Sequence, residues 1–81
     1  MTIILFTTRA PNTLSVELTG QGREVYEALA ISEVLALAEQ HPASQILITP
    51  EVDQKRASMI QQHYPTIRMH GQFRLMDVSA N

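Results

Sequence analysis

Runs of apolar residues alternate with helix-like segments along the whole chain. Four runs have the length and the β-branched content of strands, and they cover residues 2–7, 23–28, 45–49 and 66–70. The first and third runs are apolar almost throughout, which is typical of strands that are covered on both faces of a sheet. The second run alternates between apolar and polar residues, as an edge strand does. Together these patterns predict βαβ units built around a parallel sheet.

Capping residues and helix breakers indicate where the intervening helices begin and end. Ser32 and Asp53 stand where N-caps would precede the second and third helical patterns. Pro42 and Pro65 follow the ends of these patterns, because proline cannot continue a helix. We therefore expect one helix after Ser32 and another over residues 53–63.

The segment 14–19 fits two structures. Leu14 and Leu18 lie four residues apart, as on one face of a helix, but Leu14, Val16 and Leu18 also alternate as in a strand. The strand interpretation would make a hairpin with residues 23–28. We favour a short helix capped by Asn12 or Thr13, because a glycine follows its last apolar residue, as at many helix C-termini.

Length and composition indicate a single domain with some surface reserved for a partner. We expect residues 1–71 to form the α/β domain, and residues 72–81 to form a C-terminal tail that is either an added edge strand or a partner-contacting segment. Hydrophobic residues make up 44% of the 81 residues and charged residues only 17%. This low charge content suggests that a partner covers part of the surface.

Charge and residue types exclude several classes of partner and chemistry. The net charge of -2 argues against binding to a nucleic-acid backbone, which needs a basic face. The chain has no cysteine, so thiolate chemistry and thiolate metal sites are excluded. The apolar run 3–6 is too short for a signal sequence or a membrane span. We expect a cytoplasmic protein without a membrane partner.

The apolar spacing resembles the receiver domain of two-component response regulators. The matching positions are residues 3–6, then Leu14, Leu18 and Gly22 at intervals of four, then 24–28, 33–37, 46–48 and 59–67. The resemblance covers roughly residues 3–71. It implies a flavodoxin-like, three-layer α/β fold with a four-stranded, mostly parallel sheet in the order 2-1-3-4. The last strand and helix of that family would be missing.

The catalytic residues of receiver domains do not carry over to this chain. The family has two acidic residues after its first strand, where this chain has Thr7 and Thr8, and a phosphate-accepting aspartate after its third strand, where Thr49 stands. Magnesium needs carboxylate oxygens, and we expect none at this edge of the sheet. The resemblance therefore implies a non-catalytic, receiver-like regulatory module that is not phosphorylated and needs no cofactor.

An alternative function uses the strand ends to bind a small anion or nucleotide, or to form a minimal enzyme. Ligands in open α/β sheets lie beyond the carboxyl ends of the strands, where a helix N-terminus can also receive an anion. Asn12 would assist in such a site. The candidate ligand-binding residues at these strand ends are Thr7, Thr8, Arg9, Thr49 and His70.

The three histidines do not predict a metal site. His41 and His63 lie near the expected helix C-termini, where the helix dipole explains them, and His70 is distant from both in the sequence. We expect no metal.

The missing last strand predicts a protein–protein interface. Without that strand, one edge of the fourth strand and part of a sheet face would be exposed, and exposed edges invite pairing. We therefore expect a homodimer, or a complex with another protein, through residues 66–78. The expected interface residues are Met69, Phe73, Leu75, Met76 and Val78.

Overall fold

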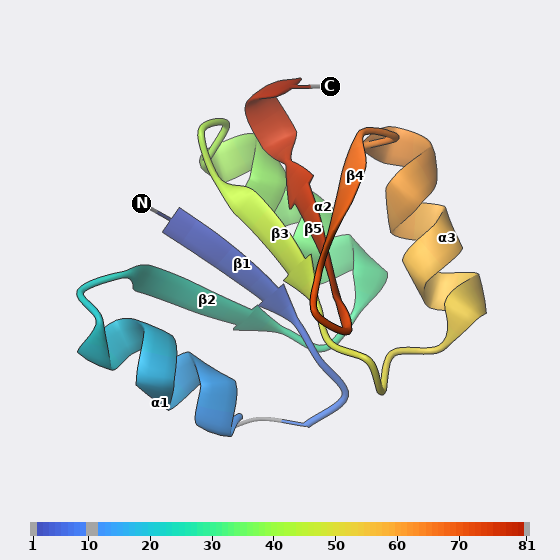
Figure 1. Cartoon of the computed structure of the whole chain (residues 1–81). Helices are drawn as coiled ribbons and strands as arrows, with labels where there is room; N and C mark the ends of the chain where they lie inside the picture. The colour runs from blue at the N-terminus through green and yellow to red at the C-terminus, as the bar shows by residue number, and fades with distance from the viewer. Residues whose placement is uncertain (1, 10–11, 81) are drawn as a thin grey trace.

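Within residues 2–9 and 12–80, which the computed structural model describes, five strands form one mixed sheet with three α-helices against its faces (Figure 1). The elements in chain order are β1 (Thr2–Phe6), α1 (Thr13–Gly20), β2 (Glu24–Ala28), α2 (Ile31–Gln40), β3 (Gln45–Ile48), α3 (Gln54–His63), β4 (Ile67–His70), β5 (Phe73–Asp77) and the 3₁₀ helix η1 (Val78–Ala80). The prediction of alternating strands and helices is confirmed as far as β4. The strand β5 was not predicted as part of the sheet interior.

The strand order is β2-β1-β3-β5-β4, so the predicted order 2-1-3-4 is wrong. β1 pairs in parallel with both β2 and β3, as expected. β5 then lies between β3 and β4 and runs antiparallel to both of them. Two of the four strand pairings are therefore antiparallel, and the predicted four-stranded, mostly parallel sheet of the flavodoxin type is corrected to a five-stranded mixed sheet.

A tight turn is the physical reason for this difference. Only Gly71 and Gln72 separate β4 from β5, and Gly71 has a φ of 65°. A glycine with positive φ at the first central position is typical of the type II′ turn that joins antiparallel strands. The chain therefore reverses at once, and β5 returns beside β4 instead of leaving the sheet.

Side-chain composition suits β5 to the sheet interior and β4 to its edge. Met76 of β5 is fully buried, and Leu75, which points to the opposite face, is half-buried. In β4, by contrast, Arg68 and His70 are exposed. Charged side chains on an edge strand discourage pairing with other chains.

The helix ends confirm two of the three sequence predictions. The side-chain oxygen of Asn12 accepts a hydrogen bond from the backbone N–H of Leu14 at 2.9 Å, so the segment after it is a helix rather than a strand. Asp53 caps α3 through the backbone N–H of Arg56 at 2.8 Å. The prediction for Ser32 is wrong, because α2 begins at Ile31, two residues earlier than a cap at Ser32 would give, and its N-cap, Ala30, makes no side-chain capping hydrogen bond.

The core consists of two clusters, one on each face of the sheet. The larger cluster lies between the sheet and the helices α2 and α3, and it includes Phe6, Val34, Ile60 and Met76. The smaller cluster lies under α1 and includes Leu5, Leu18 and Leu47. Of the described helices, α1 alone covers this second face, and it lies over the β2 side.

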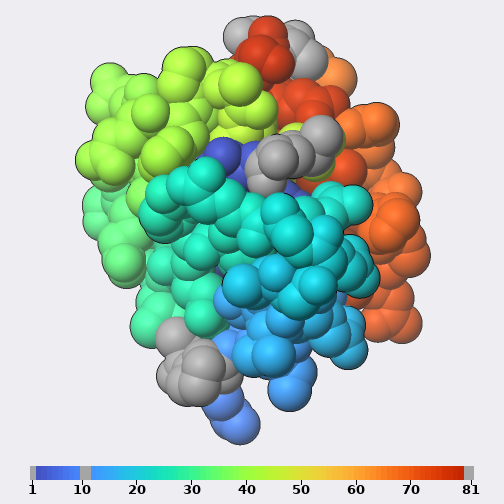
Figure 2. Space-filling model, turned by 90° about the vertical axis from the view of Figure 1, so that its left-hand side faces the viewer, coloured from blue at the N-terminus to red at the C-terminus, as the bar shows by residue number. Residues whose placement is uncertain are grey.

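We call the part of this second face over β3, β5 and β4 the open face. In Figure 1 these strands lie in front of α2, with no helix drawn over them, while α1 lies below β2. Figure 2 shows the side of the molecule on which α1 and β2 lie next to each other, with the connection between α2 and β3 above them. Helices thus cover both faces of the sheet on the side of β2 and β1, and only one face on the side of β5 and β4.

The internal position of β5 predicts that Met76 contributes much more than Met69 to the free energy of unfolding. Met76 is fully buried, so Met76→Ala should lower the free energy of unfolding by about 2–5 kcal/mol. Met69 is 63% exposed on the edge strand, so Met69→Ala should change it by no more than about 0.5 kcal/mol. Urea denaturation measures both values. Equal effects at the two positions would contradict the described strand order.

Candidate functional site

The carboxyl ends of β1 and β3 lie side by side along one end of the sheet, at the point where the strand order reverses. β1 lies between β2 and β3, and the helices α1 and α2 lie on opposite faces. In open α/β sheets this switch point is the usual place for a ligand. We call the residues that follow the two strands here, 7–9 and 49–51, the strand-end rim.

A chain of hydrogen bonds connects polar side chains at the strand-end rim. The Thr7 hydroxyl donates to Glu51 Oε1 at 3.0 Å, and Asn12 Nδ2 donates to the Thr7 hydroxyl at 3.0 Å. The backbone N–H of Asn12 donates to Glu27 Oε2 at 3.0 Å. These bonds tie the start of α1 to the ends of β1, β2 and β3.

The rim environment keeps the Glu51 carboxyl ionised. Its partial burial would by itself raise the pKa of Glu51, but a hydrogen bond from its own backbone N–H and the nearby Thr49 side chain lower it. The Thr7 hydroxyl and the positive charge of Arg9 act in the same direction. The net result is a pKa of Glu51 below its ordinary value.

The structure therefore corrects the expectation that this edge carries no carboxylate. Glu51 lies two residues beyond the apolar run that forms β3, and Glu27 is the penultimate residue of β2. Neither carboxylate was expected here, because Glu27 lies inside a strand-like run and Glu51 lies in a loop past one, separated from it by Pro50. A loop residue two positions past a strand end reaches the same edge.

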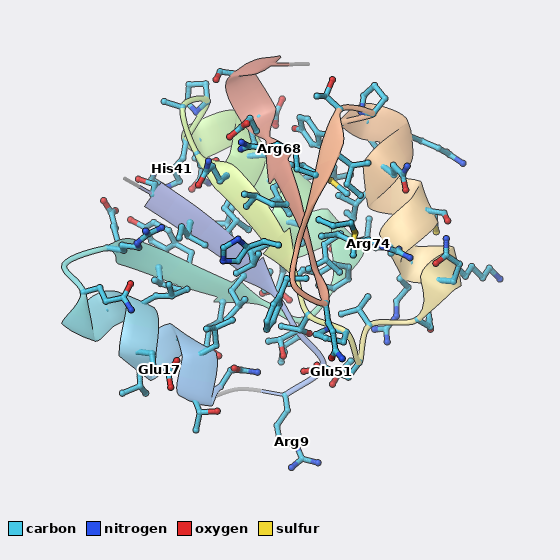
Figure 3. The ribbon with its side chains drawn as sticks, viewed as in Figure 1. Arg9, Glu17, His41, Glu51, Arg68 and Arg74 are labelled. Carbon is cyan, nitrogen blue, oxygen red and sulfur yellow. The ribbon has the colours of Figure 1, made fainter. Side chains whose placement is uncertain are left out.

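A hollow of about 470 Å³ lies beside the rim, lined by Thr8, Arg9, Asn12, Thr13 and Glu51. Figure 3 shows Glu51 close to the sheet edge and Arg9 extending away from the protein below it. An anion in this hollow would meet an ionised carboxylate as well as the guanidinium, so the electrostatics do not favour a phosphate group. Among the described residues, no group of three or more histidine, aspartate or glutamate side chains is placed to hold a metal.

The structure brings together four of the five predicted ligand-binding residues. Thr7 is buried, whereas Thr8 and Arg9 are exposed beside it. Thr49 is buried at the end of β3, where its hydroxyl donates to the Phe6 carbonyl at 3.3 Å. His70 lies apart from these four residues. It ends β4, and β5 lies between β4 and β3.

A second concavity, of about 510 Å³, lies on the open face between α1 and the β4–β5 hairpin; we call it the groove. Apolar side chains from the sheet and from α1 make up more than half of its lining, and polar or cationic side chains make up the rest. The lining residues are Ile3, Leu14, Leu18, Leu47, Phe73 and Leu75, with Gln21, Arg23, Gln45, Arg68 and His70.

The charged residues that line the groove are cationic. Arg23 stands just before β2, and Arg68 lies across the groove on β4; of the described residues that line the groove, none is acidic. The carboxylate of Asp77 lies next to this lining. It accepts a hydrogen bond from Gln45 Nε2 at 2.7 Å and forms an ion pair with Arg68 Nη2 at 2.7 Å. The groove and the hollow beside the rim share no lining residue, and Arg68 and Glu51 lie far apart in Figure 3, so the two are separate sites.

The five predicted interface residues have different environments. Phe73 and Leu75 are half-buried and line the groove. Met69 is exposed on β4, and its side chain contributes to a smaller hollow next to Pro50. Met76 is fully buried and Val78 is half-buried, and both pack in the larger core cluster. Of the five, Met76 alone presents no surface to a partner, and Val78 packs against the opposite face of the sheet from the groove.

Comparisons with protein-family models, with curated proteins and with solved structures gave no significant match to this chain. The resemblance to receiver domains therefore stays a prediction. Across residues 2–9 and 12–80, no helix has both the length and the apolar character that are needed to cross a membrane.

The ionised state of Glu51 predicts a pH-dependent contribution to stability. A carboxyl whose pKa is lowered in the folded protein stabilises it above the ordinary pKa, and the contribution is lost as the pH falls through the folded value. Glu51→Gln should therefore lower the free energy of unfolding by about 1 kcal/mol at neutral pH, since water screens the exposed side of the group. The difference should be smaller at about pH 3, which lies below the ordinary pKa of 4.5 for a glutamate.

Urea denaturation of both proteins at the two pH values measures this effect. Glu17→Gln is the matched control, because Glu17 is an exposed carboxylate on α1. A Glu51→Gln deficit that persists unchanged in acid would show that the carboxylate charge is not responsible.

Proposed function

We propose that this protein is a non-catalytic module that binds another protein through the groove on its open face. The observation that carries the proposal is an apolar concavity over a sheet half that no described helix covers. Parallel α/β sheets ordinarily bury both faces under helices, and an antiparallel part that faces water ordinarily carries polar residues there; the open face instead carries the apolar Phe73 and Leu75. A partner that covered Phe73 and Leu75 would complete the missing layer.

The size and lining of the groove support this role. Its volume of about 510 Å³ falls within the range typical of binding sites, about 300–1,000 Å³. Apolar side chains from four different elements converge there, and polar groups lie beside them. This combination is expected of a recognition surface, where burial gives affinity and the polar groups give orientation.

A small-ligand or enzymatic function at the strand-end rim has less support. The polar groups of Thr7, Asn12 and Glu51 already bond to one another. A hydrogen-bonded chain of this kind explains the side chains as a structural tie between the loops. Arg9 and Glu51 also carry opposite charges, so a charged ligand that one of them attracts is repelled by the other.

The regulatory, receiver-like role and the cytoplasmic location remain parts of this proposal. The role is supported by the apolar spacing and by the threonines at positions 7, 8 and 49, where the acids of a receiver would stand, and the location by the shortness of the apolar run 3–6. A receiver-like protein without these acids would act through its surface alone.

Site-specific photo-crosslinking in the cells that produce the protein tests the proposal. The full chain carries p-benzoylphenylalanine in place of Phe73 in the groove or, as a matched control, in place of Met59, which is 44% exposed on α3. We expect discrete heavier adducts after irradiation from position 73 and none from position 59. Equal adducts from both positions, or none from either, would contradict the proposal.

A further inference from the structure

The dimensions of the open face match those of a single α-helix. Neighbouring strands lie about 4.8 Å apart, so β1 and β4, three spacings apart in the sheet, are separated by about 14 Å. A helix with its side chains is about 10–12 Å wide. The side of α1 that carries Leu14 and Leu18 already forms one wall of the groove. A second helix would therefore fit beside α1, above β3 and β5.

The charges along the groove select for an acidic occupant. Arg23 and Arg68 stand on its two sides, with the imidazole of His70 near the hairpin turn. Asp77 balances the charge of Arg68, so Arg23 is the lining cation that attracts an acidic group most directly. The whole chain has a net charge of -2, so a groove with cationic and no acidic lining residues differs from the average surface. Carboxylates that flank the apolar stripe of a docked helix would meet these groups, and complementary charge guides both orientation and association.

Within the described ranges, a second copy of this chain offers no suitable helix. The exposed large apolar side chains among the described residues are Val16, Leu29, Met59 and Met69. They give α1 and α3 one such side chain each and α2 none, whereas a docked helix needs several on one face.

A symmetric dimer through the open face is also disfavoured. In such a dimer the same surface of both copies meets, so Arg23 and Arg68 of each copy would face the cations of the other. Asp77, the acid next to them, is already paired with Arg68. The occupant therefore comes from a different protein.

We propose that the groove binds an amphipathic α-helix of a partner protein, whose apolar stripe packs on Phe73 and Leu75 and whose flanking aspartates or glutamates face Arg23. This inference rests on the proposed function and specifies the chemistry of the partner. In helix-in-groove binding of this type, the groove binds apolar anchor residues that recur every three or four positions along the docked helix.

Two synthetic helical peptides of about five turns, with the same leucine stripe and either glutamate or lysine on both flanks, test the inference. Backbone amide shifts of the isotope-labelled protein are followed by NMR during titration with each peptide. We expect the acidic peptide to bind at least about tenfold more tightly, with the largest shifts at Leu47, Phe73 and Leu75, and the ratio to fall at high salt.

Charge reversal adds a matched pair of variants. Arg23→Glu removes a groove cation and should weaken the acidic peptide about fivefold. Lys55→Glu makes the same change in net charge on an exposed position of α3, outside the groove, and should leave the affinity unchanged. Both variants alter exposed side chains, so neither depends on a repacked core.

Four outcomes would overturn the inference: equal binding of both peptides, no binding of either, shifts confined to the edge strands, or equal effects of the two variants. Concentration-dependent shifts at the groove residues of the protein alone would also overturn it, because a second copy would then be the occupant. Crosslinks from position 73 together with any of the first four results would leave the proposed function intact while removing the acidic helix. Absence of those crosslinks would remove the proposed function itself.

Discussion

The pairing of β5 with the free edge of β3 is the interaction on which the rest of the structure depends. Its register runs from Gln45 opposite Asp77 to Ile48 opposite Arg74. This pairing satisfies backbone groups along one side of β3 that would otherwise need another partner. It also carries Met76 into the larger core cluster and places Leu75 opposite Leu47 on the other face.

The same pairing explains why one half of a sheet face is open. Each parallel crossover along the chain brings a helix: α1 comes to one face between β1 and β2, and α2 and α3 come to the other face. The step from β4 to β5 is a two-residue turn and brings no helix. The open face is therefore a consequence of topology, and the apolar side chains of β5 are the ones that it exposes.

The local features of the fold could be predicted because they depend on neighbouring residues. Asn12 caps α1 through a backbone N–H two residues away, and the glycine after that helix has a φ of 83° at Gly22. The grouping of Thr7, Thr8 and Arg9 follows from their adjacency at the end of β1. Glu51 was missed at the same edge, because its contact with Thr7 joins residues from two different strand ends.

By itself, the sequence determined the strands and helices up to β4, the parallel pairing of β1 with β2 and β3, and the threonines at the strand ends. These depend on periodicity, on caps and on the right-handed crossover rule. The tertiary structure alone decided that residues 73–77 lie inside the sheet. Apolar residues on both faces of a strand can be buried at many positions, and the choice depends on which backbone edge is left unpaired. For the same reason, only the folded chain shows Arg23, Arg68 and Phe73 around a single groove.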